Sequence, residues 1–235
     1  MKILVTGGTG YIGAHTVVEL MNSGFDVDII DNLNNSKEEV VDAIAKITGK
    51  RPLWFNIDLC DANEIKNYFS KHKPDAVVHF AAHKAVGLSV EQPLAFYHNN
   101  LLSLINLLQC CVEAKCNSFV FSSSCSVYAD PDKLPIDENA PVKTAKSPYG
   151  NTKKIGEEII TDTVRSSSLQ AVSLRYFNPV GSHDSALIGE LPTTMPLNVM
   201  PIITQVAIGK RKQFVVFGND YPTPDGSCIR DYIHV

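Results

Sequence analysis

Six short apolar runs alternate with helical patterns along most of the chain. The runs cover residues 3–5, 27–30, 53–57, 76–80, 119–121 and 171–174, and each has the length of a buried strand. Strands that alternate with helices in this way build a parallel sheet with helices on both faces. The sequence therefore predicts an α/β fold with a doubly wound parallel sheet.

The character of the chain changes after about residue 178, where prolines become frequent and the regular strand runs end. We therefore expect two regions, a sheet domain over residues 1–178 and a smaller substrate-facing region over residues 179–235. Residues 229–235 have the pattern of a strand that begins to form where the chain stops. The smaller region is accordingly expected to be incomplete. Within the sheet domain, Ser36 is expected to cap a helix that ends at Gly49, and Asp61 to cap the next one.

Composition excludes several classes of function. The 235 residues carry 21 basic and 25 acidic side chains without long runs of one sign, which disfavours a nucleic-acid partner. The N-terminal apolar run is too short for a signal peptide or membrane span, so we expect no membrane and a cytoplasmic location. Six cysteines without CxxC spacing predict reduced thiols and no metal site. Cys125 is interpreted as a small core residue rather than a nucleophile.

A glycine-rich turn directly follows the first strand run. Residues 7–13 read Gly-Gly-Thr-Gly-Tyr-Ile-Gly, and a helical pattern comes next. Gly7 allows a tight turn, Gly10 lets the backbone approach a pyrophosphate, and Gly13 permits close helix packing. The free N–H groups at the start of the helix favour a phosphate. The turn therefore predicts a dinucleotide site in a Rossmann-like sheet.

Asp31 ends the second strand run, at the position that selects the dinucleotide. Its carboxylate can accept both hydroxyls of the adenosine ribose. The same charge would repel a 2′-phosphate, and Asn32 follows it rather than an arginine, so NAD is expected rather than NADP. Asp58 ends the third strand run and is interpreted as an adenine contact or, alternatively, as a helix N-cap.

Residues 147–153 read Ser-Pro-Tyr-Gly-Asn-Thr-Lys and predict the start of a helix. Tyr149 and Lys153 then lie one turn apart on the same side. A nearby ammonium and a positive nicotinamide would favour the phenolate of Tyr149 and prepare it to remove a proton from a hydroxyl. Such a pair is by itself usually a surface feature. It gains weight from Ser124, which follows the run at 119–121 at the sheet edge where ligands bind.

The glycine turn, the strand-end serine and the Tyr-x-x-x-Lys helix resemble the extended short-chain dehydrogenase/reductase family. The segments at 31–36, 174–181, 218–223 and 230–235 are similar to the UDP-glucose 4-epimerases of that family, so the resemblance covers nearly the whole chain. It implies an isomerase of galactose metabolism that interconverts UDP-glucose and UDP-galactose through a 4-keto sugar, with tightly bound NAD. It also implies a homodimer formed through helices at residues 100–114 and 149–163.

The predicted site residues form three groups. The catalytic residues are Tyr149, Lys153 and Ser124. The cofactor contacts are Gly7, Gly10, Tyr11, Ile12, Gly13, Asp31, Asn32, Asn35, Ser36, Asp58, Leu59, Phe80, Ala81, Lys84, Asn99, Tyr149, Lys153 and Phe177. The substrate contacts that the resemblance implies are Ser124, Tyr149, Asn178, Asn198 and Arg230. Arg230 suits a diphosphate through its donor fork, and its alternative role is a surface salt bridge.

Three other functions stay open on the sequence. A nucleotide-sugar 4,6-dehydratase shares the first oxidation but needs an additional acid and base, and Cys125 and Ser126 occupy the positions where that family has acidic residues. The second is a 4-epimerase of another UDP-sugar, such as a uronate, a pentose or an N-acetylhexosamine. The third is a catalytically silent NAD-binding protein.

The chain departs from the epimerase pattern in two ways. Ala129 stands where the family commonly has glycine, and Ala82 and His83 differ from the residues usual before Lys84. Family members also continue well beyond the segment at 230–235. We therefore expect this chain to be a fragment that leaves apolar surface uncovered.

Overall fold

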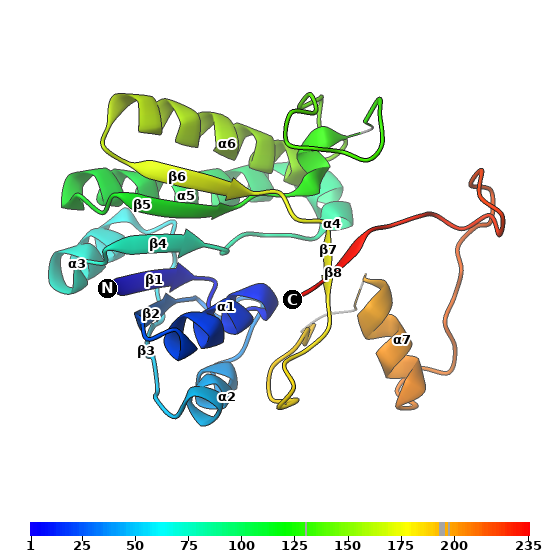
Figure 1. Cartoon of the computed structure of the whole chain (residues 1–235), viewed down its shortest axis with the longest axis horizontal. Coiled ribbons are helices and arrows are strands. Elements are labelled where there is room, and N and C mark those ends of the chain that lie inside the picture. Colours follow the sequence, from blue (N-terminus) through cyan, green and yellow to red (C-terminus); the bar gives the residue numbers. More distant parts are fainter. Residues whose placement is uncertain (130, 193–195, 197) are drawn as a thin grey trace.

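The computed structural model describes residues 1–129, 131–192, 196 and 198–235. Its centre is a six-stranded parallel sheet with the strand order β3-β2-β1-β4-β5-β6 (Figure 1). The strands are β1 (Lys2–Thr6), β2 (Asp26–Ile30), β3 (Leu53–Phe55), β4 (Ala76–His79), β5 (Ser118–Ser122) and β6 (Gln170–Leu174). The connections reverse direction between β1 and β4, which defines a doubly wound sheet. All six predicted strands and the predicted fold class are confirmed.

Helices cover both faces of the sheet (Figure 1). They are α1 (Tyr11–Asn22), α2 (Glu39–Thr48), α3 (Ala62–His72), α4 (Val86–Glu91), α5 (Pro93–Ala114) and α6 (Pro148–Ser166). Ile3 and Val5 of β1 pack in one core with α1 and α2, whereas Leu4 packs in the other with α3, α5 and α6. Alternate residues of the central strand therefore fill two separate cores, as expected for a strand buried on both faces.

Capping follows the sequence at two helix ends and departs from it at a third. The Asp61 carboxylate accepts hydrogen bonds from two backbone N–H groups at the start of α3, and Gly49 adopts a left-handed conformation after α2. The predicted cap at Ser36 is wrong, because α2 begins only at Glu39. The Ser36 hydroxyl instead donates to Asp31 Oδ1 at 3.1 Å.

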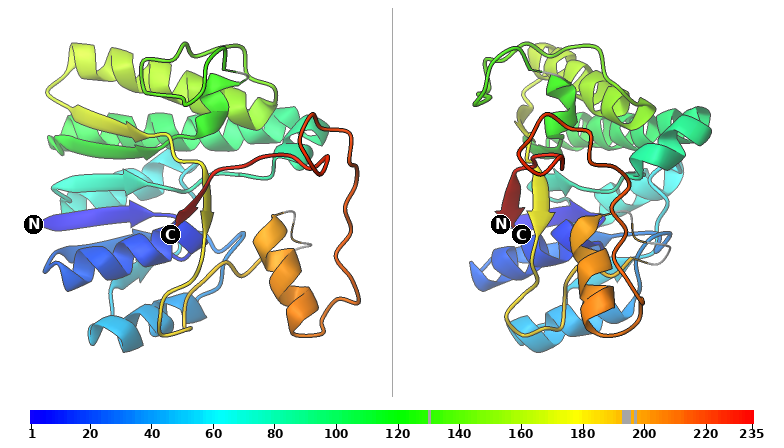
Figure 2. Two further views of the ribbon diagram at one scale, coloured as in Figure 1. Left: turned by 45° about the vertical axis from the view of Figure 1, so that its right-hand side comes forward. Right: turned by 90° about the vertical axis from the view of Figure 1, so that its right-hand side faces the viewer.

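The chain after β6 lies at the carboxyl ends of the sheet strands (Figures 1 and 2). There β7 (Asn178–Val180) and β8 (Tyr232–His234) pair in parallel as a separate two-stranded sheet, and α7 (Val199–Ala207) lies beyond them. The Tyr11 hydroxyl donates to Gly181 O at 2.8 Å, and Ile188 is buried against the core under α1. These contacts hold the segment after β7 against the sheet domain. Among the described helices, none combines the length and the apolarity needed to cross a membrane.

Candidate active site

The glycine turn between β1 and α1 leaves no space for side chains. Gly7 has a φ of +70°, and a Cβ added to it would lie 2.7 Å from Ala81 N. A Cβ on Gly13 would lie 2.1 Å from Gly7 O. Gly10 is the N-cap of α1 and brings no side chain to the first N–H groups of the helix. This bare backbone at a positive helix end fits the pyrophosphate of a dinucleotide.

Asp31 lies against this turn from the end of β2. Its carboxylate accepts hydrogen bonds from Thr9 N at 3.2 Å and from Leu33 N at 3.0 Å. Ser36 donates to the same carboxylate and hydrogen-bonds Thr9 Oγ1 at 2.6 Å. The fold thus brings Asp31 and Ser36 together beside the glycine turn. Two further predicted cofactor contacts are exposed in the same loop: Asn32 and Asn35.

The remaining predicted cofactor contacts of the sheet domain follow the ends of neighbouring strands. They are Asp58 and Leu59 after β3, Phe80, Ala81 and Lys84 after β4, and Asn99 on α5. The alternative interpretation of Asp58 as an N-cap is wrong, since Asp61 caps α3. Asn100, which sequence reasoning missed, donates to His83 O at 3.0 Å and to Thr152 Oγ1 at 3.1 Å. It therefore fastens the loop after β4 to α6.

Tyr149 and Lys153 lie in the first two turns of α6. Ser147 caps the helix by accepting from Gly150 N at 3.1 Å, and Pro148 occupies the first helical position, as predicted. Lys153 is 4% exposed, and its ammonium donates to Ser122 O at 2.7 Å. The Lys153 ammonium lies 5.8 Å from the centre of the Tyr149 ring. The two predicted catalytic side chains are therefore adjacent and face the end of β5.

Burial dominates the protonation of this pair. Burial raises the pKa of Tyr149 to about 12, with the nearby Tyr176 adding to the rise and hydrogen bonding by Ser124 opposing it. Burial lowers the pKa of Lys153 to about 8. It lowers the pKa of the neighbouring His79 to about 3, and the Lys153 charge adds to that effect. In the chain without cofactor, burial is therefore the largest influence on the pKa of Tyr149 and favours the neutral phenol.

Three serines continue from the carboxyl end of β5. Ser122 hydrogen-bonds the phenol of Tyr176, a residue that sequence reasoning missed. Ser124 Oγ accepts from Ser126 N at 3.2 Å and begins a 3₁₀ helix, η1 (Cys125–Tyr128). Burial raises the pKa of the Cys125 thiol. A raised pKa disfavours the thiolate that a nucleophilic cysteine requires.

Two of the predicted substrate contacts lie in or next to the two-stranded sheet, Asn178 in β7 and Arg230 two residues before β8. Asn178, next to the half-buried Phe177, donates from its side-chain amide to Asp231 O at 2.8 Å. Arg230 is exposed and donates to Ile229 O at 2.7 Å. Cys125 N donates to Tyr176 O at 3.2 Å and Asn178 N donates to Asp231 O at 3.3 Å, so this segment approaches the end of β5. The pairing of β7 with β8 therefore brings residues 178 and 230 to the same edge as Ser124.

The remaining predicted substrate contact, Asn198, is the residue directly before α7. It is exposed and donates to Glu190 Oε1 at 2.7 Å, and the same oxygen pairs with Lys84 Nζ at 3.5 Å. Burial raises the pKa of Tyr11 to about 12, and the negative charge of Glu190 contributes to that rise. Sequence reasoning missed Glu190, since no pattern in an irregular loop pointed to it. Ile12 follows Tyr11 in the first turn of α1.

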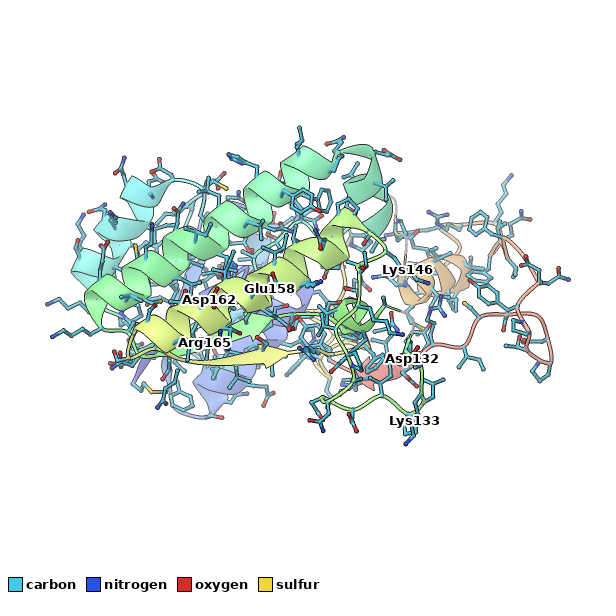
Figure 3. All side chains as sticks on the ribbon, turned by 90° about the horizontal axis from the view of Figure 1, so that it is seen from above. Asp132, Lys133, Lys146, Glu158, Asp162 and Arg165 are labelled. Atoms are coloured by element: carbon cyan, nitrogen blue, oxygen red, sulfur yellow. The ribbon has the colours of Figure 1, made fainter. Side chains whose placement is uncertain are left out.

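An open pocket of about 570 Å³ lies beside residues 142–146. It is lined by Ala129, Val142, Lys143, Thr144, Lys146 and Lys154, of which Lys146 is labelled in Figure 3. None of the predicted site residues lines it. Across the described ranges, no three His, Cys, Asp or Glu side chains gather closely enough to hold a metal ion.

Known proteins match this chain over its whole length. The model of the NAD dependent epimerase/dehydratase family matches residues 3–235. The UDP-glucose 4-epimerase of Yersinia enterocolitica is 48% identical over 236 residues, which cover 100% of this chain and 70% of that protein. A bifunctional UDP-glucose 4-epimerase and UDP-xylose 4-epimerase of Pisum sativum is 49% identical and is covered over 68% of its length, by 100% of this chain.

Solved structures agree in the arrangement of the backbone. The UDP-glucose 4-epimerase of Bifidobacterium longum, crystallised with NAD+ and UDP, superposes with a TM-score of 0.96 at 43% identity. The match covers 100% of this chain and 70% of that one. The backbone described above is therefore shared with a protein that holds a dinucleotide and a uridine nucleotide.

Proposed function

We propose a reaction for this chain from one premise: the chain belongs to the NAD dependent epimerase/dehydratase family. The reaction is the interconversion of UDP-glucose and UDP-galactose by inversion at C4, which makes the chain an isomerase. The observation that carries this assignment is the 48% identity, over the whole chain, to a UDP-glucose 4-epimerase. The adjacency of Tyr149, Lys153 and the end of β5 supports it.

The chain binds NAD, and the glycine turn with Asp31 beside it fits that cofactor. The chemistry that NAD supplies when bound is reversible acceptance of a hydride from C4 of the sugar. The bare backbone at Gly7, Gly10 and Gly13 lets N–H groups approach the pyrophosphate, and Asp31 holds the adenosine ribose. The reaction has no net redox, so tight retention of the cofactor suits it.

Three side chains take part in the transfer of the proton from the sugar hydroxyl in this proposal. Tyr149 removes the proton from the 4-hydroxyl, Ser124 hydrogen-bonds the same oxygen, and Lys153 stabilises the phenolate. Ser124 and Lys153 have to offset the burial that raises the pKa of Tyr149 to about 12. The 4-keto sugar then turns within the site, so that return of the hydride to the opposite face of C4, with the proton from Tyr149 to the oxygen, would invert the configuration at C4.

Asn178, Asn198 and Arg230 are proposed to hold the nucleotide and the sugar of the substrate. Arg230 is exposed just before β8, and its guanidinium can present two parallel donors to a diphosphate. We also propose that residues 1–178 bind the cofactor while residues 179–235 face the substrate. The separate two-stranded sheet at the carboxyl edge supports this division.

A second candidate function is 4-epimerisation of another UDP-sugar. A relative that is 49% identical carries a UDP-xylose 4-epimerase activity in its name, which favours a pentose as the additional substrate. Dehydration is disfavoured because Cys125 and Ser126 offer neither the acid nor the base that elimination of water needs. Parallel assays with UDP-galactose, UDP-xylose and an N-acetylated UDP-hexosamine separate the sugars.

Replacement of the proposed base tests the reaction directly. Tyr149→Phe should lower kcat for UDP-galactose by about 10²- to 10⁴-fold, because it removes the only proton acceptor proposed at C4. The control is Tyr221→Phe, a similar change on an exposed tyrosine outside the proposed site. Epimerisation is followed by coupled detection of UDP-glucose. An undiminished Tyr149→Phe variant contradicts the proposal, and an unmodified chain without activity on any of the sugars favours a silent NAD-binding protein.

We propose a homodimer formed through α5 and α6, which lie side by side (Figure 3). Leu94, Ile105 and Val112 are exposed on α5 and recur at the helical period, so they form one apolar stripe. A second copy that packs on this stripe would remove it from water. The six cysteines are free, which suits the reducing cytoplasm as the location of the protein.

A further inference from the structure

A single carboxylate on α6 binds groups from two other elements. Glu157 accepts two bonds from Arg175, which follows β6, with Nε to Oε1 at 2.9 Å and Nη2 to Oε2 at 2.6 Å. It also accepts a short hydrogen bond from the Ser123 hydroxyl after β5. The Glu157 side chain is 13% exposed, and Ser123 is 1% exposed. A carboxylate that is largely shielded from water and accepts three charge-assisted bonds is held in one position.

The same face of α6 carries the proposed catalytic pair. Tyr149, Lys153 and Glu157 are spaced four residues apart, so they lie in a row along the helix. Lys153 holds Ser122 through its backbone oxygen, and Glu157 holds Ser123 through its hydroxyl. Two consecutive residues at the end of β5 are therefore tied to the helix, directly before Ser124.

Arg175 extends the network to the far end of η1. Its Nη1 donates to the Tyr128 hydroxyl at 3.0 Å, and its guanidinium lies 4.9 Å from the centre of the same ring. Tyr128 is buried and ends η1, whereas Ser124 begins it. Ser124 thus lies between two fixed points, Ser123 and Tyr128, and both depend on the Glu157–Arg175 pair.

We propose that Glu157 is a positioning residue that fixes the Ser124 hydroxyl relative to Tyr149. The inference rests on the proposed function, since it assigns to Ser124 and Tyr149 their roles on the sugar hydroxyl. Glu157 does not touch the substrate and acts through Ser123 and Arg175. Hydrogen bonding by Ser124 lowers the pKa of Tyr149, so a displaced Ser124 leaves that pKa higher. Loss of the tie should therefore move the acid limb of the kcat profile to higher pH.

Two variants of the full chain test the contacts of Glu157 with Ser123 and Arg175, one by changing the charge and the other by removing a single hydrogen bond. Glu157→Gln removes the charge that pairs with Arg175, and Ser123→Ala removes only the hydroxyl, so it leaves the ion pair intact and the fold secure. We expect each to lower kcat with UDP-galactose by about tenfold or more, with KM within about twofold, because a small misplacement of a reacting group is costly. The acid limb should move to higher pH in both, and Ser123→Thr should restore it.

The controls repeat each change where the network is absent. Glu158→Gln alters an exposed glutamate on α6 (Figure 3), and Ser118→Ala alters an exposed serine at the other end of β5. Both should keep kcat and the pH profile of the unmodified chain. A Ser123→Ala variant with unchanged kcat and profile overturns the inference. So does a loss of kcat that only follows a lower melting temperature while the acid limb stays in place.

Crystal structures of the same variants separate this inference from the proposed function. If the unmodified chain does not epimerise UDP-galactose, the proposed function fails, and the position of Ser124 Oγ relative to Tyr149 still tests the tie. A displaced Ser124 in Glu157→Gln and Ser123→Ala, with Ser124 unmoved in the two controls, supports positioning by Glu157. An unmoved Ser124 in all four variants refutes it.

Discussion

Ala129 adopts a backbone conformation that is strained for any residue other than glycine. It has φ of 50° and ψ of −123° directly after η1. Residues other than glycine rarely adopt this region, and the strain is about 1–3 kcal/mol. This is the position where the resembling family commonly has glycine. The structure thus gives a physical reason for that preference and identifies a strained residue close to the site.

Relief of this strain should be measurable in the isolated protein. Ala129→Gly should raise the free energy of unfolding by about 1 kcal/mol, because the gain in the folded state exceeds the extra freedom of the unfolded chain. Urea unfolding followed by circular dichroism measures it. Ala140→Gly is the matched control, since Ala140 lacks a positive φ and the change should be slightly destabilising. Equal effects of the two changes would contradict the assignment of strain.

The sequence predicted those site residues that belong to a single short motif. The spacing of Tyr149 and Lys153, with a serine cap before them, sufficed to place both on one side of a helix. Glu157 continues the same spacing, but its partner Arg175 lies 18 residues away and meets it only because β6 returns beside β5. Partnerships of that kind depend on the register of the sheet, which the sequence pattern does not contain.

Close docking of α6 on the sheet depends on one glycine. A Cβ added to Gly156 would lie 2.8 Å from Phe121 Cζ and 3.2 Å from Leu104 Cδ2. The helix backbone can therefore approach β5 and α5 closely, and Lys153 on the preceding turn reaches the end of β5. Gly156 is in this way part of the geometry that brings the proposed catalytic helix to Ser122.

Addition of one methyl group tests the docking. Gly156→Ala should destabilise the protein by about 1 kcal/mol, since overpacking costs about 1–3 kcal/mol and alanine regains about 1 kcal/mol of helix propensity. Gly87→Ala on α4 has open space around the added Cβ and should be neutral or stabilising. Phe121→Leu in the Gly156→Ala background should recover part of the loss. Thermal unfolding compares all the variants. A Gly156→Ala variant that is more stable than the unmodified chain would show that Phe121 and Leu104 can move aside without cost.

Strands and helices were predicted best where an apolar run was bounded by residues typical of turns. The six strands follow from their apolar runs, which are long enough to be buried and too short for helices. The start of α2 was predicted two residues too early, because the hydroxyl of Ser36 donates to Asp31 rather than capping the helix. A local capping rule cannot anticipate a competitor that tertiary structure supplies.

At the scale of the whole molecule, α5 exposes apolar surface that the sheet domain does not use. Ile105 lies in the middle of the stripe with Leu94 and Val112. Ile105→Glu should convert the proposed dimer to a monomer, because it places a charge in a desolvated contact. Light scattering after size-exclusion chromatography measures the mass. Ile208→Glu makes the same change at an exposed position after α7 and should leave the mass unchanged.

The strand order of the sheet has a consequence for how the protein is made. On a ribosome, β1 emerges first, and each later strand has its neighbour already synthesised: β2 joins β1, β3 joins β2, β4 joins the free side of β1, and β5 and β6 extend that side in turn. No strand has to be inserted between two others that have already paired. The sheet can therefore grow outward from β1 while translation continues, and residues 179–235 meet the carboxyl edge of a sheet whose six strands have all been synthesised.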